Sequence, residues 1–370
     1  DAHPVVLGGN IHTRDDHLVI RDCDSVCIHN GQVGDEYFKE IMQFSSNDEI
    51  DTKKLLRMYD HIGEKELLRR IPGAYTVAIA DKRRPELMVL RDKSGIRPGV
   101  LGWKDGKHLV ASENSALRER GAKIREELVP GTVYYISSDG QEYRKESIVD
   151  PEPRHCFFEW NYIAAPDSTL SRLHVRRLRE TLGEQLAREF SREPCSANID
   201  FVSYLPECPE DAARSFATTI GKPCIDVFYK RENERAFQGS NKEDRRKSIK
   251  KNLHLATNIE NTIQGKRCAF IDDSLIRGNN IRWARHLLYN VAKVSEAYLL
   301  NYTPPFGIIP SDGVPRGCLF GVDTPPIETE EHSFIARNRT CEEISKEIGM
   351  PERYLSIDGM MEVFELLGIP

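Results

Sequence analysis

The sequence predicts two domains of different class: an N-terminal α+β domain built on antiparallel strands, and a C-terminal α/β domain with a parallel sheet. Between residues 25 and 137, short apolar runs follow one another with few helical patterns between them. After residue 156, apolar runs alternate with helical patterns, which indicates parallel strands joined by crossover helices. We therefore expect domains at residues 1–150 and 151–330, with helices of residues 331–370 packing on the second domain.

Composition limits the class of protein. The chain has 370 residues, of which 39% are hydrophobic and 30% charged, and it is long enough for two separate cores. No apolar run is long enough to cross a bilayer, so we expect neither a membrane protein nor a secreted one. The net charge of −6 argues against a general nucleic-acid binder. Nine cysteines without a Cys-x-x-Cys spacing indicate reduced thiols and a cytoplasmic location.

In the first domain, polar residues stand at the end of one strand and the start of one helix. The strand Ser25–Ile28 runs into His29-Asn30-Gly31, and a helix of residues 52–68 follows Asp51, which is placed to cap it. Asn-Gly after a strand is typical of a turn, because both residues tolerate positive φ. An Asn amide beside a Gly N–H can also form an oxyanion hole, but by itself the tripeptide favours the turn. Further strands are expected at residues 73–80, 87–90, 100–103, 108–112 and 132–137, with a structured loop at residues 91–98.

The segment Asp150-Pro151-Glu152-Pro153 is stiff and polar, and it is the expected linker. The second domain follows with a helix whose apolar residues recur at intervals of three and four from Val175 to Phe190. Strands are expected at residues 199–205, 224–229 and 294–300, and terminal helices at residues 341–349 and 359–367.

The stretch Cys268–Asn280 carries the strongest functional signal. Its first four residues are apolar and lead directly into Asp272 and Asp273, as in a buried strand that ends at the carboxyl edge of a parallel sheet. A loop of small and polar residues with Gly278 follows, and then a helical pattern over residues 281–288 whose N-terminus favours an anion. A solvated acidic turn is the alternative. The order of strand, acids, loop and helix instead favours a phosphate site, with carboxylates for sugar hydroxyls or a divalent ion.

This stretch resembles the phosphoribosyl pyrophosphate (PRPP) loop of type I phosphoribosyltransferases, in the form found in the amidophosphoribosyltransferase family. The resemblance implies Mg²⁺ on Asp272 and Asp273, and a lid over the pyrophosphate formed from a Lys, an Arg-x-Phe and a later Arg. Without the resemblance, the basic run of residues 245–251 would be a solvated helix face. The implied PRPP-binding residues are Asp272, Asp273, Ser274, Arg277, Gly278, Asn279, Asn280, Lys230, Arg235 and Arg245.

The N-terminal half resembles the glutamine amidotransferase domain of the same family, an N-terminal-nucleophile (αββα) fold of two stacked antiparallel sheets between helices. The resemblance implies that Asn30 and Gly31 stabilise the oxyanion and that Asp51 holds the amino group of glutamine. The family's nucleophilic cysteine lies upstream of the stretch that resembles Asp1–Pro4, so we expect an N-terminally incomplete domain, completed by preceding residues or by a separate chain. The motifs are His29-Asn30-Gly31, Asp51-Thr52, Gly73-Ala74-Tyr75, residues 91–98 and Ala111-Ser112-Glu113.

Two further segments resemble the same family. Residues 157–168 resemble a signature that crosses between the two domains, and residues 317–323 resemble the last strand region of the transferase domain. Cys156 and Cys318 stand where two ligands of a structural iron–sulfur cluster occur in some members, although two buried thiols would account for them equally. The chain departs from the family's usual residues at Ala165, Cys208, Lys242, Asn279 and Asn280.

The resemblance implies an amidophosphoribosyltransferase, a glycosyltransferase in which ammonia displaces pyrophosphate from C1 of PRPP to give phosphoribosylamine for purine synthesis. Glutamine would supply the ammonia if the missing segment is present. The departures motivate an alternative, a catalytically degenerate homologue that acts as a regulatory or assembly partner. A phosphoribosyltransferase with a different amine or base acceptor is a third option. The family also implies a homo-oligomer and purine nucleotides as inhibitors.

Overall fold

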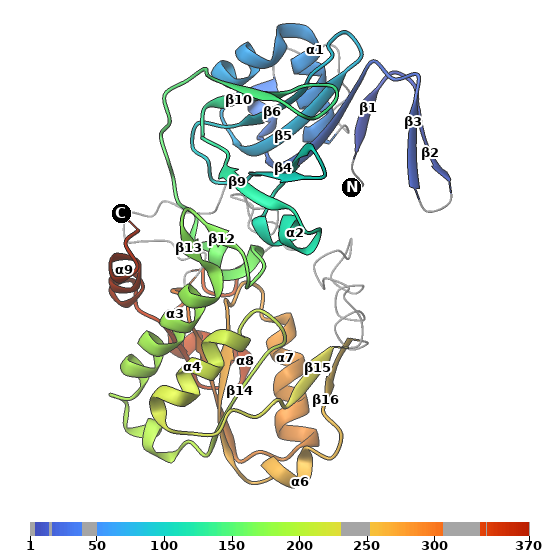
Figure 1. Ribbon diagram of the computed structural model, residues 1–370. Coiled ribbons are helices and arrows are strands. Elements are labelled where there is room, and N and C mark those ends of the chain that lie inside the picture. The colour runs from blue at the N-terminus through green and yellow to red at the C-terminus, as the bar shows by residue number, and fades with distance from the viewer. Residues whose placement is uncertain are drawn as a thin grey trace. The chain divides into compact units, whose positions relative to one another are not determined.

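The computed structural model describes residues 4–14, 17–38, 50–230, 252–305, 334–337 and 339–369, which form two compact units (Figure 1). Unit 1 contains the described residues up to Glu159, together with Ile163–Arg172. Unit 2 contains Trp160–Tyr162 and the described residues from Leu173 onward. In the described part of the chain, no helix has the length and apolar character needed to span a membrane.

Unit 1 is built on a six-stranded antiparallel sheet in the order β1-β4-β5-β6-β10-β11. Side chains of β5 alternate between its two faces, and Tyr75, Val77 and Ile79 pack with the apolar side of helix α1 (Asp51–Arg70). The strands are β1 (Val5–Leu7), β4 (Ser25–Gln32), β5 (Ala74–Asp81), β6 (Leu87–Arg91), β10 (Thr132–Ile136) and β11 (Tyr143–Ser147).

A three-stranded antiparallel sheet covers the other face of the six-stranded sheet. Its order is β8-β7-β9, with β7 at Val100–Lys104, β8 at Lys107–Ala111 and β9 at Lys123–Glu127. Ala78 and Tyr134 of the large sheet form a core with Leu101 of β7, and helix α2 (Asn114–Glu119) places Leu117 against Val100. The layers are therefore α1, sheet, sheet and α2, which confirms the expected αββα class.

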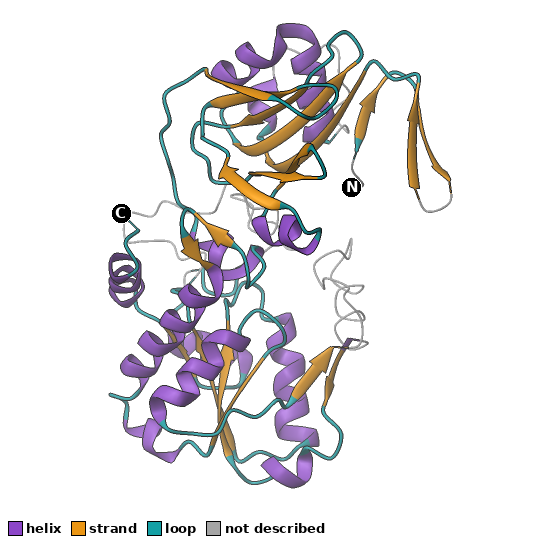
Figure 2. Cartoon of the chain, in the orientation of Figure 1, coloured by secondary structure: helices purple, strands orange, loops and turns teal. Residues whose placement is uncertain are grey.

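Unit 2 contains a parallel sheet in the order β14 (Phe201–Tyr204), β17 (Arg267–Asp272), β18 (Glu296–Asn301) and β19 (Glu352–Tyr354). Figure 2 shows its strands flanked by helices. On one face, Phe270 and Leu299 pack with residues of α7 (Asn279–His286) and α8 (Cys341–Ile348). On the other face, Phe190 of α3 (Val175–Phe190) lies 6.1 Å from Tyr298 between ring centroids. Burial on both faces explains why the central strands β17 and β18 contain apolar runs.

The remaining elements are short or lie outside the two main sheets. These elements are β2 (Asn10–Arg14), β3 (His17–Arg21), η1 (Asp35–Phe38), η3 (Glu159–Ile163), β12 (Thr169–Leu170), β13 (Leu173–His174), η4 (Pro194–Asn198), α4 (Glu210–Ile220), β15 (Phe228–Lys230), β16 (Leu253–Leu255), α6 (Glu260–Ile263), η6 (Leu287–Val291) and α9 (Ile357–Leu366). Strands β15 and β16 pair with each other antiparallel.

Several strands differ from the sequence-based expectation, which did not include β9, β11 or β16. Only helices were expected after residue 330, whereas Glu352–Tyr354 adds a fourth strand through its pairing with Leu299–Asn301. This strand has three residues and no apolar run, so only its neighbour identifies it. The strand expected at residues 224–229 is broken: Cys224 bridges Val202 in parallel, and β15 starts four residues later. The strand expected at residues 317–323 lies outside the described residues.

Glu352 is a carboxyl group enclosed by the sheet of unit 2. Its side chain is fully buried (0% exposed), and its Oε1 accepts a hydrogen bond from Nδ2 of Asn301 at 3.0 Å. Burial raises the pKa of Glu352 to about 8, because removal from water disfavours the carboxylate, although the hydrogen bond from Asn301 and the charge of Arg353 oppose the shift. Between about pH 4.5 and pH 8, the folded chain therefore keeps the proton of the Glu352 carboxyl group, which the unfolded chain releases.

We predict that Glu352 makes the free energy of unfolding fall as the pH rises from about 4.5 to about 8. The pKa of Glu352 is higher in the folded chain than in the unfolded chain. Its contribution to stability is therefore fully present below the unfolded pKa and is lost as the pH rises through the folded pKa. The loss is at most about 5 kcal/mol. Urea unfolding across this range should show a flatter pH dependence for Glu352→Gln. The exposed Glu365→Gln on α9 should keep the wild-type slope, and equal slopes in all three proteins would contradict the assignment.

Candidate active sites

His29, Asn30 and Gly31 do not form the turn that the tripeptide alone favours. They continue strand β4, where Asn30 lies opposite Thr76 and Gly31 opposite Tyr75 in the antiparallel register with β5. A Cβ atom on Gly31 would lie 2.1 Å from the backbone oxygen of Ala74, so the neighbouring strand leaves room only for glycine. The turn interpretation is wrong because tertiary pairing with β5 outweighs the local preference of Asn-Gly.

The Asn30 side chain is half-buried and faces a loop of residues 91–98. Its Nδ2 donates to the backbone oxygen of Pro98 at 3.4 Å. Arg91, which is only 4% exposed, fixes this loop by donating from Nε to Arg97 O at 3.0 Å and from Nη2 to Gly95 O at 2.6 Å. The amide of Asn30 is therefore oriented by a loop that is itself held by a buried guanidinium.

Asp92 holds the same loop to strand β5. Its Oδ1 accepts from the backbone N of Tyr75 at 3.0 Å, and its Oδ2 accepts from the backbone N of Ser94 at 2.8 Å. Asp92 is 2% exposed, so both bonds are shielded from water. Tyr75 is the residue opposite Gly31, and this bond thus links the loop to the strand position beside the predicted oxyanion residues.

Asp51 joins the first turn of α1 to the chain just after β4. Its Oδ2 accepts from the backbone N of Val33 at 3.1 Å, and its Oδ1 accepts from the backbone N of Thr52 at 2.7 Å. The Asp51 side chain remains 26% exposed, and Nδ1 of His29 lies 3.9 Å from its Oδ2. The fold therefore brings Asp51 close to the strand that carries Asn30 and Gly31. Sequence reasoning did not single out His29.

Cys27 lies on the same strand but has the properties of a core residue. It is fully buried, and burial, with the nearby charge of Asp51, raises the pKa of the Cys27 thiol to about 12. A thiol with such a pKa stays protonated near neutral pH and is a poor nucleophile.

In unit 2, the acid pair lies where the sequence predicts, at the carboxyl end of β17. Asp272 and Asp273 are 5% and 8% exposed, so they do not form a solvated acidic turn. The backbone N of Tyr302 donates to Asp272 O at 3.1 Å, and Oγ1 of Thr303 donates to Asp273 O at 2.7 Å. These bonds from the end of β18 fix the backbone that carries both carboxylates.

The charges around the acid pair explain how it is tolerated in the interior. Burial raises the pKa of both carboxyl groups, and for Asp272 the charge of Asp273 raises it further. Lys230 at the end of β15 opposes the shift at Asp272, and Arg179 of α3 opposes it at Asp273. Without a cation, burial and mutual repulsion disfavour ionisation of both carboxyl groups. A bound divalent cation would favour it, and the carboxylate oxygens are suitable ligands for such an ion.

Arg179 was missed by sequence reasoning, which treated its helix as a core helix only. It is 1% exposed and is among the largest fully buried side chains of the described residues. Its Nε donates to the backbone oxygen of Trp160 at 2.9 Å. An arginine directly after Leu178, inside the apolar stripe of α3, was the only sequence signal.

The loop after the acid pair is compact. Oγ of Ser274 donates to Oδ2 of Asp273 at 3.0 Å, and Gly278 has a left-handed backbone (φ 72°) with Ile335 next to it. Helix α7 begins at Asn279, two residues earlier than the apolar pattern predicts. Asn279 and Asn280 thus lie in the first turn of the helix, where backbone N–H groups lack intrahelical acceptors.

The other predicted residues divide into described and undescribed ones. Arg277 lies in the loop and its backbone oxygen accepts from Nη1 of Arg282 at 3.0 Å. Burial, with Asp273, raises the pKa of the Cys208 thiol to about 12, so this residue is a protonated thiol and a weak magnesium ligand. Arg235, Lys242, Arg245 and Cys318 lie outside the described residues.

Nothing in the described residues supports an iron–sulfur cluster. Cys156 is half-buried, and no group of three or more His, Cys, Asp or Glu side chains in the described ranges is arranged to hold a metal.

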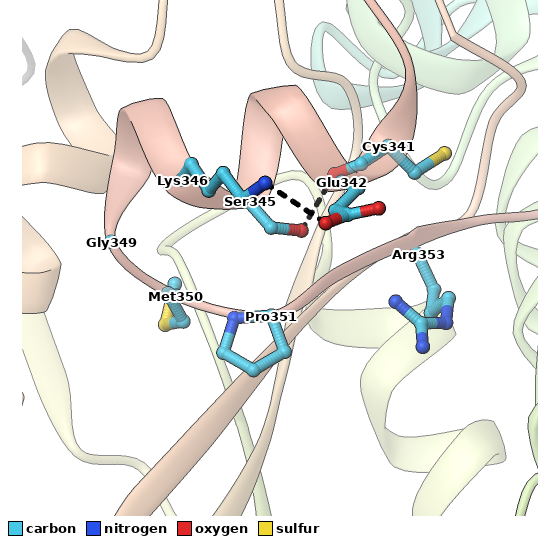
Figure 3. A pocket seen from close by; sticks show the side chains of 8 residues that line it. All are labelled: Cys341, Glu342, Ser345, Lys346, Gly349, Met350, Pro351 and Arg353. Carbon is cyan, nitrogen blue, oxygen red and sulfur yellow. Dashed lines mark hydrogen bonds and ion pairs between the residues drawn. The ribbon is translucent and has the colours of Figure 1, made fainter.

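A separate pocket lies between α8 and β19 and contains none of the predicted site residues (Figure 3). Its volume is about 620 Å³. Nζ of Lys346 lies 2.9 Å from Oε1 of Glu342, and Oγ of Ser345 donates to the backbone oxygen of Cys341 at 2.6 Å. These polar groups partner one another, so we do not assign the pocket a ligand.

Comparison with known proteins gives consistent results for both units. Residues 24–145 match the glutamine amidotransferase domain family. The chain is 32% identical to the amidophosphoribosyltransferase of Escherichia coli over 291 residues, which cover 76% of this chain and 54% of that one. It is 31% identical to that of Mycobacterium tuberculosis over 303 residues, or 81% and 54% of the two chains. The chain thus spans about half the length of these relatives.

Among solved structures, the chain resembles the glutamine PRPP amidotransferase of Bacillus subtilis complexed with ADP and GMP. The TM-score is 0.76 at 25% sequence identity, and the match covers 98% of this chain and 75% of that one. The expected order of an N-terminal-nucleophile domain followed by a type I phosphoribosyltransferase domain is confirmed by this match.

We predict that Gly31→Ala lowers the free energy of unfolding by roughly 1–3 kcal/mol, because the new methyl group must displace the backbone of β5. Urea unfolding monitors the change. Gly106→Ala is the matched control: its φ of 77° carries backbone strain, but nothing lies within 4 Å of the added Cβ. A Gly31→Ala loss no larger than the control loss would contradict a steric origin.

Proposed function

The chain is a homologue of the amidophosphoribosyltransferases, and from this premise we propose that it transfers ammonia to C1 of PRPP, releasing pyrophosphate and forming phosphoribosylamine for purine synthesis. The observation that carries the proposal is the buried pair Asp272 and Asp273 at the carboxyl end of β17, followed by a phosphate-type loop and a helix N-terminus. The relatives from Escherichia coli and Mycobacterium tuberculosis are both named amidophosphoribosyltransferase, which is the activity proposed.

The proposed reaction needs positioning and charge stabilisation rather than covalent catalysis. Ammonia attacks C1 of the ribose while the bond from C1 to the pyrophosphate oxygen breaks, through an oxocarbenium-like state. In our proposal, Asp272 and Asp273 accept hydrogen bonds from the ribose hydroxyls. Lys230, with Arg235 and Arg245 outside the described residues, neutralises the leaving pyrophosphate and forms the lid that excludes water.

The same carboxylates are the proposed holders of Mg²⁺. Carboxylate oxygens are the ligands this ion prefers, and bound Mg²⁺ would offset the negative charge of the pyrophosphate. Backbone N–H groups of Ser274, Arg277, Gly278 and the first turn of α7 are the proposed partners of the PRPP 5′-phosphate, because the helix dipole and unbonded N–H groups both favour an anion there. The Asn279 and Asn280 amides can donate to the same phosphate.

In unit 1, we propose that Asn30 and the N–H of Gly31 stabilise the oxyanion formed when glutamine is cleaved. Asp51 would accept hydrogen bonds from the amino group of glutamine, and its partial exposure leaves the carboxylate accessible. The nucleophile of this half-reaction is none of these three residues, and Cys27 is excluded by its burial.

The proposal extends to regulation only as far as the comparisons suggest. The similar Bacillus subtilis structure holds ADP and GMP, and we propose that purine nucleotides also bind this chain. Assembly into a homo-oligomer, completion of unit 1 by a separate chain and a cytoplasmic location stay predictions.

We predict that the protein releases pyrophosphate from PRPP when Mg²⁺ and ammonium are present. Replacing ammonium with glutamine reports separately on the amidotransferase half. A catalytically degenerate homologue would give no release with ammonium, and a transferase for another acceptor would release pyrophosphate only with that acceptor. Either result would overturn the proposed reaction.

Asp272→Asn and Asp273→Asn are each expected to weaken PRPP binding in the presence of Mg²⁺ by roughly 10-fold to 100-fold, the range for losing a hydrogen bond to a charged group. Isothermal titration calorimetry measures the affinity. Asp358→Asn makes the same chemical change on the exposed first turn of α9 and should bind PRPP like the wild type. Unchanged affinity in both site variants would remove the acid pair from the PRPP site.

A further inference from the structure

The imidazole ring of His29 lies between the predicted oxyanion glycine and the helix that begins at Asp51. On one side, a Cβ atom added to Gly31 would lie 2.9 Å from Nε2 of His29, so this edge of the ring faces the glycine closely. On the other side, Nδ1 of His29 lies 3.0 Å from Oγ1 of Thr52, which is hydrogen-bond distance. The ring therefore occupies the space between the two parts of the proposed glutamine site in unit 1.

The hydroxyl of Thr52 connects this ring to the Asp51 carboxylate. Oγ1 of Thr52 donates to Oδ1 of Asp51 at 3.4 Å, and the backbone N of Thr52 donates to the same oxygen at 2.7 Å. Because the hydroxyl carries one proton, both of its bonds form together only when Nδ1 of His29 carries a proton and donates it to Oγ1. The hydrogen bonds then run in one direction, from His29 through Thr52 to Asp51.

His29 acts on Asp51 through the threonine rather than by direct contact. Its Nδ1 lies 3.9 Å from Oδ2 of Asp51, which is too far for a hydrogen bond. The side chain of His29 is 1% exposed and Thr52 is 2% exposed, whereas the Asp51 side chain is 26% exposed. Hydrogen bonds shielded from water hold their geometry better than exposed ones. The inner part of the arrangement is therefore fixed, and the accessible group is the carboxylate.

The Asp51 carboxylate has room for one further donor. An ionised carboxyl group offers about four acceptor positions. Within the described residues, three hydrogen bonds to it are formed, from the backbone N of Val33 and from the backbone N and the hydroxyl of Thr52. These bonds fix the plane of the carboxylate. The remaining position therefore has a constant direction, as recognition of an ammonium group requires.

We propose that His29 is a positioning residue of the glutamine site: lying beside Gly31, it orients the Thr52 hydroxyl, which holds the Asp51 carboxylate for the amino group of glutamine. The inference rests on the proposed role of Asp51 and extends it to two buried side chains. The alternative is that His29 only fills the space between β4 and α1. Positioning affects ligands that have the amino group, whereas a filling role affects all ligands of the site alike.

The first test changes Thr52 and measures two ligands, glutamine and glutaramate, which is glutamine without its amino group. Thr52→Val removes the hydroxyl, and we expect it to raise the Kd for glutamine roughly 3-fold to 10-fold without changing the Kd for glutaramate. Thr52→Ser keeps the hydroxyl and should bind both ligands like the wild type. Thr181→Val is the matched control, because it removes a buried hydroxyl that donates to Arg177 O at 2.7 Å on α3.

The second test changes His29 itself. His29→Leu removes the donor and should raise the Kd for glutamine by a similar factor, again without changing the Kd for glutaramate. His29→Asn keeps an N–H donor near the place of Nδ1 and should recover part of the affinity. Because His29 acts through Thr52, His29→Leu should add little in the Thr52→Val background. The control is His108→Leu, since Nδ1 of this half-buried histidine lies 3.0 Å from Gly140 O, away from the site.

Calorimetric affinities and urea unfolding are measured on the same full-chain preparations. Equal rises in Kd for glutamine and glutaramate indicate a merely structural role and overturn the proposal. A wild-type Kd for glutamine in folded His29→Leu or in Thr52→Val overturns it as well. If His29→Leu does not fold, the comparison of Thr52→Val with Thr52→Ser decides. A wild-type protein that does not prefer glutamine to glutaramate instead rejects the proposed role of Asp51.

Discussion

The constraint on which unit 2 depends is the burial of two neighbouring carboxylates at the end of a central strand. Asp272 and Asp273 cannot both ionise in the interior without opposite charge nearby. The charges of Lys230 and Arg179 oppose the rise in the pKa of Asp272 and Asp273, respectively, and hydrogen bonds from Tyr302 and Thr303 fix the backbone of the pair. The resulting charge imbalance suits a ligand that brings a divalent cation, which is the chemistry that we propose for the site.

Unit 1 depends on a steric constraint instead. The β4 and β5 backbones approach so closely at Gly31 that no side chain fits between them. This contact keeps Asn30 and Gly31 in a strand, and the loop held by Arg91 and Asp92 then supplies the partner for the Asn30 amide. Rigid positioning of this kind is what an oxyanion site requires, because its donors must be in place before charge develops.

The segment of residues 157–168 contributes to both units in turn. Glu159 forms an ion pair with Arg97, and the backbone N of Ala165 donates to Glu113 at 2.9 Å, all within unit 1. Between them, the three residues from Trp160 to Tyr162 are bound by side chains of unit 2. Four backbone groups of this stretch are thus held by side chains that lie between 19 and 141 positions away along the chain.

The sequence by itself determined the class of both domains, the acid pair and its strand, and the helices that start at Asp51 and Cys341, because strand and helix periodicity and the order of motifs are local properties. Only the tertiary structure decided that Asn30 and Gly31 stay in a strand, that Glu352–Tyr354 adds a strand to the sheet, and that the charge of the buried Arg179 acts on Asp273. Each of these depends on a partner more than 40 positions away along the chain, as in the β4–β5 and β18–β19 registers. A single sequence does not show which distant residues will pair, and the site's electrostatics follow from that pairing.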